Sequence, residues 1–187
     1  MSEVVLYHHV QGLTDGVRSF ADHLRHAGHT VHTPDLFDGR RFDTIDDGMA
    51  FARAAGFGAL VERGIAAADG LDADVVYAGF SFGVMPAQQL AQRRPGARGA
   101  VLMCGCLPVS EFGAAWPADV PVQVHGKRED EFFAEDLGAA QELVASADDG
   151  ELFLYPGEEH LFADSSLPAY DASATALLTE RVLAFLS

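Results

Sequence analysis

The sequence predicts an α/β fold in which a mostly parallel sheet carries helices on both faces. Short apolar runs rich in β-branched residues alternate with longer stretches at helical spacing. The run Gly99–Cys104 is apolar throughout, which is typical of a strand buried on both faces. At 187 residues and 49% hydrophobic content, the chain suits one globular domain and is not disordered. We therefore expect a single domain over residues 1–187 with about six or more strands.

The first elements follow from spacing and from residues that stop helices and strands. Val4–Tyr7 is expected to be the first strand, and Thr30–Thr33 the second, which Pro34 closes. Between them, Val17–Ala27 is expected to be a helix that Gly28 ends. Its apolar residues recur at helical spacing: Val17, Phe20, Ala21 and Leu24.

The next region is less regular. Asp35–Asp47 is polar and is expected to be a loop, and residues 35–48 are a candidate cap over a binding site. Met49–Ala68 is mostly helical in pattern, but three glycines are expected to break it: Gly56, Gly58 and Gly64. Asp74–Ala78 is expected to be the third strand.

The second half continues the alternation. Gly99–Cys104 is the expected fourth strand, Pro121–His125 the fifth and Glu151–Tyr155 the sixth. Ala134–Ala145 is expected to be a helix, and Ala172–Leu186 a closing helix. Since parallel sheets bind ligands beyond the carboxyl ends of their strands, reactive residues at the strand exits are the ones to look for.

The third strand runs directly into Gly79-Phe80-Ser81-Phe82-Gly83, and a helical run follows it. A Gly-x-Ser-x-Gly sequence between a strand and a helix is typical of a nucleophile elbow, a turn so tight that side chains near the serine would clash. Strand and helix on either side make the match more specific than the five residues alone. We therefore expect Ser81 to be exposed above the end of the sheet as a nucleophile.

Two further polar residues follow later strands. Asp130 lies after the fifth strand, with Glu129 and Glu131 beside it, and His160 lies after the sixth. A serine hydroxyl needs a base to take its proton, and the base needs a carboxylate to orient it. The order serine, acid, histidine is that of α/β hydrolases. The sequence therefore predicts a catalytic set of Ser81, Asp130 and His160.

A tetrahedral intermediate also needs donors for its oxyanion. One is expected to be the backbone N–H of Phe82, directly after the nucleophile. The second is expected from the loop after the first strand, at the N–H of Val10. Because Phe162 is close to His160 in the sequence, we also expect it to line the substrate pocket.

Charge and cysteine content exclude several classes of protein. The net charge of −16 argues against binding to nucleic acid or to an anionic membrane surface. No apolar stretch reaches the roughly 20 residues that cross a bilayer, and no signal peptide is apparent. Cys104 and Cys106 are expected to be buried, inert thiols in a protein of the reducing cytoplasm. No metal or organic cofactor is expected, and the oligomeric state is not specified.

Several segments together resemble the dienelactone hydrolase family over nearly the full length. They are His9–Gly12, His29–Phe37, Gly79–Gly83, Asp130–Phe133 and Tyr155–Ala163. The resemblance implies an α/β-hydrolase fold and hydrolysis of esters or lactones without a cofactor. It is closest to the serine-bearing members, because the type enzyme of the family has a cysteine where this chain has Ser81.

Two other differences from the type enzyme concern the substrate. A glutamate in the loop after its first strand is matched here by His9, which is therefore a candidate either to line the pocket and contact substrate or simply to pack there. Arginines in the type enzyme bind a substrate carboxylate, one of them shortly after the histidine, where this chain has Asp164. Because an acid there would repel a carboxylate, dienelactone itself is not the expected substrate.

Two functions remain open on this sequence. The first is a serine hydrolase that cleaves small esters or lactones through an acyl-enzyme on Ser81. The second is a non-catalytic protein of the same fold that binds a small molecule or a partner, because a fold does not guarantee chemistry.

Overall fold

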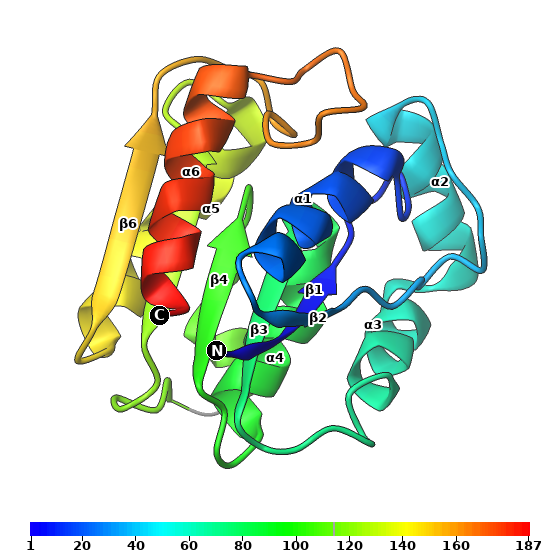
Figure 1. Ribbon diagram of the computed structural model, residues 1–187. Helices are drawn as coiled ribbons and strands as arrows, with labels where there is room; N and C mark the ends of the chain where they lie inside the picture. The colour runs from blue at the N-terminus through cyan, green and yellow to red at the C-terminus, as the bar shows by residue number, and fades with distance from the viewer. Residues whose placement is uncertain (114) are drawn as a thin grey trace.

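The computed structural model describes residues 1–113 and 115–187. In the part described, six strands form one sheet in the order β2-β1-β3-β4-β5-β6, and every neighbouring pair is parallel (Figure 1). The strands are β1 (Glu3–Tyr7), β2 (Thr30–His32), β3 (Val75–Phe80), β4 (Gly99–Met103), β5 (Val122–Lys127) and β6 (Gly150–Tyr155). All six strands agree with the sequence prediction to within two residues at each end.

Helices cover both faces, as predicted. In Figure 1, α1 and α6 lie in front of the sheet, and α3, α4 and α5 lie behind it. The helices are α1 (Asp15–His26), α2 (Ile45–Ala55), α3 (Phe57–Ala66), α4 (Val84–Arg93), α5 (Glu131–Ser146) and α6 (Ala172–Phe185). Short 3-10 turns lie at Ser81–Gly83 and Val109–Phe112.

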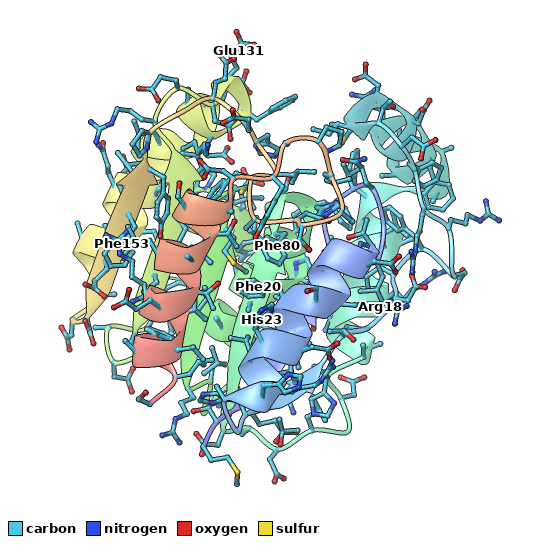
Figure 2. The ribbon with its side chains drawn as sticks, turned by 45° about the horizontal axis from the view of Figure 1, so that its top comes forward. Arg18, Phe20, His23, Phe80, Glu131 and Phe153 are labelled. Carbon is cyan, nitrogen blue, oxygen red and sulfur yellow. The ribbon has the colours of Figure 1, made fainter. Side chains whose placement is uncertain are left out.

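The two faces of the sheet belong to two separate hydrophobic cores, because side chains alternate along a strand. In β1, Val4 and Leu6 pack in the core shared with α1 and α6, whereas Val5 and Tyr7 pack in the core on the other face. Between α1 and β3, the rings of Phe20 and Phe80 meet edge to face with centroids 5.2 Å apart (Figure 2).

Helix boundaries differ from the prediction where a polar residue caps an N-terminus. The Asp130 side chain accepts the Phe132 N–H, so α5 begins at Glu131, three residues early. The Thr44 side chain accepts the Asp47 N–H, so α2 begins at Ile45 inside the segment expected to be loop. The predicted break in the long helical stretch is at Gly56, whose φ of 89° ends α2.

The strand order fixes where a ligand can bind. β1 lies between β2 and β3, so the direction of strand succession reverses at β1, and a crevice opens beyond the carboxyl ends of β1 and β3. In the described part of the chain, no helix is both long and apolar enough to cross a bilayer.

Candidate active site

The turn after β3 places Ser81 in an uncommon backbone conformation, with φ at 48°. Two glycines make this turn possible. A Cβ atom on Gly79 would lie 2.2 Å from the carbonyl oxygen of Gly83, and one on Gly83 would lie 2.5 Å from that of Tyr7. The turn therefore packs directly against its own start and against the end of β1, which points Ser81 out beyond the sheet.

Ser81, His160 and Asp130 are in contact although they come from three separate loops. Ser81 Oγ is 2.8 Å from His160 Nε2, and His160 Nδ1 is 2.6 Å from Asp130 Oδ2. Asp130 is 1% exposed and His160 10% exposed. Because an ionised carboxylate only accepts hydrogen bonds, Nδ1 carries the proton. Nε2 is then left as the acceptor for the serine hydroxyl.

Asp130 has two tasks that use different oxygens. Oδ1 accepts the N–H of Phe132 at 3.0 Å and caps α5, while Oδ2 faces the imidazole. The carboxylate is therefore fixed in orientation by the start of a helix. Phe132 in turn packs on His160, with ring centroids 4.7 Å apart.

A buried lysine holds the loop that carries His160. Lys127, 2% exposed, donates to Glu159 at 2.5 Å and to Asp171 at 2.8 Å. Burial alone would lower the pKa of Lys127, but these hydrogen bonds outweigh it and raise the pKa. Glu159 immediately precedes His160, so the ion pair fixes the backbone beside the imidazole.

A pocket of about 280 Å³ opens beside Ser81 and His160. Its wall is mostly apolar and includes Val10, Ile45, Met49, Phe57, Phe82 and Leu107. Val10 and Phe82, the two residues expected to supply oxyanion donors, are thus both on this wall. The remaining polar lining residues are Glu135 and Asp136 of α5.

Comparison with known proteins places this arrangement in a family. The sequence matches the dienelactone hydrolase family over residues 1–187. The chain belongs to the dienelactone hydrolase family. None of the curated proteins with which the sequence was compared matches it.

Solved structures agree with the family assignment at the level of the fold. A dienelactone hydrolase-like promiscuous phosphotriesterase from metagenomic libraries has a TM-score of 0.78 at 20% identity, covering 100% of this chain and 85% of that one. A Xanthomonas campestris pv. campestris protein of the α/β hydrolase superfamily has a TM-score of 0.61 at 25% identity, covering 98% and 99%. A cold-adapted esterase from an Arctic intertidal metagenomic library has a TM-score of 0.66 at 18% identity, covering 100% and 82%. The predicted α/β-hydrolase fold is confirmed.

Two residues expected in the pocket of this dienelactone hydrolase family member are not on its wall. Phe162 is fully buried beside Tyr155, with ring centroids 5.3 Å apart, in the core under α6. His9 is also fully buried, and its Nε2 is 2.7 Å from Asp164 Oδ2. Phe162 is close to His160 in the sequence but packs in the core, and His9 packs inside the fold rather than on the pocket wall.

Asp164 likewise does not line the pocket. Its carboxylate accepts the Thr14 hydroxyl at 2.5 Å and the Ser166 N–H at 2.8 Å, in addition to its bond with His9. Burial alone would raise the pKa of Asp164, but the hydrogen bonds from His9, Ser166 and Thr14 outweigh it and lower the pKa to about 2. The carboxylate is therefore held in its charged form by hydrogen bonds inside the protein, away from the pocket wall.

The pocket's acids were missed in the sequence. Phe132, Glu135 and Asp136 stand at positions i, i+3 and i+4 of α5 and therefore share one face. Burial, the largest influence, raises the pKa of Asp136, although the Cys106 N–H that it accepts at 3.1 Å acts in the opposite direction. Their helical spacing from Phe132 was the available signal.

Segment 35–48 is held in place more firmly than a free loop. Leu36 and Phe37 are completely buried, and the Leu36 N–H donates to His8 Nε2 at 3.0 Å. Phe42 exchanges hydrogen bonds with Gln11, its N–H donating to the Gln11 carbonyl at 3.0 Å and its carbonyl accepting from the Gln11 amide. Within the segment, Ile45 reaches the pocket wall.

The two cysteines are unpaired and buried. Cys104 lines the pocket with a φ of 59°, close to Ser81. Burial raises the pKa of both thiols, that of Cys106 to about 12. Because the thiolate is the reactive form of cysteine, neither thiol competes with Ser81 as a nucleophile near neutral pH.

Proposed function

We propose that the protein is a serine hydrolase that cleaves small carboxylic esters or lactones through an acyl-enzyme on Ser81. The observation that carries the proposal is the unbroken contact from Ser81 Oγ to His160 Nε2 at 2.8 Å and from His160 Nδ1 to Asp130 Oδ2 at 2.6 Å. Family membership supports a hydrolase, and the adjoining apolar pocket supports a small substrate.

In the first half of the reaction, His160 Nε2 takes the proton of Ser81 while Oγ attacks the ester carbonyl carbon. The carbonyl oxygen becomes an oxyanion, for which we propose the backbone N–H groups of Phe82 and Val10 as donors. Each such donor typically lowers the barrier by roughly 3 kcal/mol. The tetrahedral intermediate collapses when the bond to the leaving oxygen breaks and His160 returns the proton to the departing alcohol.

In the second half, water replaces the alcohol. His160 Nε2 takes a proton from the water, the hydroxide attacks the acyl carbon, and the bond to Ser81 Oγ breaks as the proton returns to the serine. Asp130 keeps the imidazole in the required tautomer and stabilises its cation in both halves. A lactone follows the same course, except that its alcohol remains attached to the acyl group.

A fluorophosphonate probe tests the proposal directly, since it reacts covalently with an activated serine. The wild type should gain one adduct on Ser81 by intact-mass and peptide analysis, and Ser81→Ala should gain none. Esters of p-nitrophenol with increasing acyl length, together with several lactones, should be hydrolysed by the wild type. Their turnover should fall by about 10⁴-fold or more in Ser81→Ala. A folded wild type that is neither labelled nor active would support the non-catalytic binder instead.

We further place the protein in the reducing cytoplasm, a proposal supported by its two unpaired thiols.

A further inference from the structure

The charged side chains around the reactive serine all have one sign. Glu135 and Asp136 line the pocket together with Ser81 and His160, and its described lining includes no lysine or arginine. Lys127, at the end of β5, is already paired with Glu159 and Asp171. The protein's net charge of −16 adds a negative field around the opening.

Among the residues that the structure describes, no lysine or arginine pairs with the carboxylate of Asp136, and His160 on the same wall is the positive group that favours its charged form. Its recorded hydrogen bond is from a neutral group, the backbone N–H of Cys106 at 3.1 Å. Partial burial raises its pKa, which means that the negative form is less well solvated there than in water. A cation brought into the pocket would restore part of the lost solvation and stabilise the carboxylate.

The same pocket offers the aromatic surface that suits a weakly hydrated cation. The rings of Phe57, Phe82 and Phe132 line it, and the face of an aromatic ring attracts positive charge. Its volume of about 280 Å³ admits a group such as trimethylammonium beside the ester. The aromatic wall and the two acids therefore both favour a weakly hydrated cationic group.

We infer that the pocket selects esters whose pocket-bound group carries a positive charge, and that Glu135 and Asp136 determine this selectivity. The inference rests on the proposed hydrolase function and names its substrate class. It reverses the preference implied by the family's type enzyme, whose arginines hold a substrate carboxylate. In this chain the acid that follows the histidine, Asp164, is hydrogen-bonded within the protein and does not line the pocket, whereas the acids of α5 do.

The test compares esters of equal shape and different charge. Choline butanoate and 3,3-dimethylbutyl butanoate differ only in a quaternary nitrogen in place of a carbon, and a third butanoate has an alcohol ending in a carboxylate. A second series places the same three groups on the acyl side of p-nitrophenyl esters. In at least one series, kcat/KM should be about tenfold higher for the cationic than for the neutral ester, and lowest for the anionic one. Added salt should reduce the preference.

Two variants assign the preference to residues. Glu135→Gln and Asp136→Asn should each lower the ratio of cationic to neutral kcat/KM, and the double variant should bring it within about twofold of unity. Asparagine retains an oxygen that can accept the Cys106 N–H, so the local structure is preserved. The control is Glu142→Gln, an exposed residue two turns further along α5 that changes net charge equally, and it should leave the ratio unchanged.

The outcomes separate this inference from the function on which it rests. Ser81-dependent hydrolysis of the neutral esters with no cationic preference in either series would overturn the inference and leave the hydrolase proposal intact. A cationic preference that survives the double variant would overturn the assignment to Glu135 and Asp136. Absence of both hydrolysis and probe labelling would overturn the hydrolase proposal and the inference together.

Discussion

Two of the histidine–carboxylate pairs at the carboxyl end of the sheet differ in the order of their groups. In one, the imidazole of His160 stands between a hydroxyl and a carboxylate, with Ser81 on one nitrogen and Asp130 on the other. In the other, the carboxylate of Asp164 stands in the middle and receives both His9 and the Thr14 hydroxyl. The second ring nitrogen of His9 accepts the N–H of Gln11 at 3.2 Å.

The difference shows why one pair can move protons and the other holds the fold. His160 has a nitrogen free to accept from Ser81 and is partly exposed beside a pocket, whereas both nitrogens of His9 are occupied in a fully buried site. The His9 pair instead joins the loop after β1 to the loop after β6. A histidine near a carboxylate is therefore a base only when its other nitrogen faces a reactive group.

The strongest test of this comparison is Asp130→Asn. Asparagine keeps an oxygen to cap α5 but presents an N–H₂ to His160 or stabilises the wrong tautomer, so kcat should fall by about 10⁴-fold. The measurement is steady-state hydrolysis of a p-nitrophenyl ester. Glu129→Gln is the matched control, because in the described structure Glu129 accepts the Gly157 N–H at 2.7 Å and forms no hydrogen bond or ion pair with His160, and it should change kcat less than about threefold. Equal losses in the two variants would contradict the assignment of Asp130.

Breaking the second pair, His9 and Asp164, should lower the stability of the protein. Asp164→Ala leaves His9 and Thr14 with buried donors that have no acceptor, and the free energy of unfolding should fall by roughly 3 kcal/mol. Urea unfolding measures this loss. Below the denaturation range, kcat for the same ester should stay within a few fold of wild type. A kcat loss comparable to that of Asp130→Asn, with stability unchanged, would show that the two pairs do not differ as described.

A smaller effect concerns His8, the neighbour of His9. Its Nδ1 donates to the His9 carbonyl at 2.7 Å and its Nε2 accepts the Leu36 N–H, so both bonds require the neutral ring. Burial lowers the pKa of His8 from 6.5 to about 4. Between these values the unfolded chain binds a proton that the folded protein does not, so stability falls as pH is lowered.

We expect the free energy of unfolding to drop by about 2 kcal/mol between pH 6.5 and 4.5 from His8 alone. Buried His125, whose pKa burial lowers to about 3, adds to the drop. Urea titrations at several pH values measure the slope, which should be shallower in His8→Gln. A slope that is the same in the variant and the wild type would exclude His8 as its source.

The sequence was sufficient to predict the strands and the three residues that meet at the candidate active site. The carboxyl ends of parallel strands lie along the same edge of the sheet, so Ser81, Asp130 and His160 could be grouped from topology alone. Their contact is a matter of geometry that the sequence could not supply. The identity of the pocket wall was not accessible in the same way, because it depends on which side of a loop or helix faces inward. Phe162 was therefore misplaced and His9 could not be assigned to pocket or packing, while Glu135 and Asp136 could have been found from their shared helical face with Phe132.

The predicted starts of two helices, α2 and α5, were wrong for a more local reason. Asp130 and Thr44 each cap a helix, and their polar surroundings resemble loop when apolar periodicity is the criterion. A search for capping residues ahead of each helical pattern would have moved α2 and α5 to their observed starts.

The position of His160 on the edge strand's exit has a consequence for biogenesis. Ser81 is synthesised long before His160, and the imidazole reaches it only after β6 has paired with β5 at the border of the sheet. A nascent polypeptide still missing β6 therefore carries an unactivated hydroxyl. Reactivity toward a covalent serine probe should appear late in synthesis, and its onset would report that the sheet is complete.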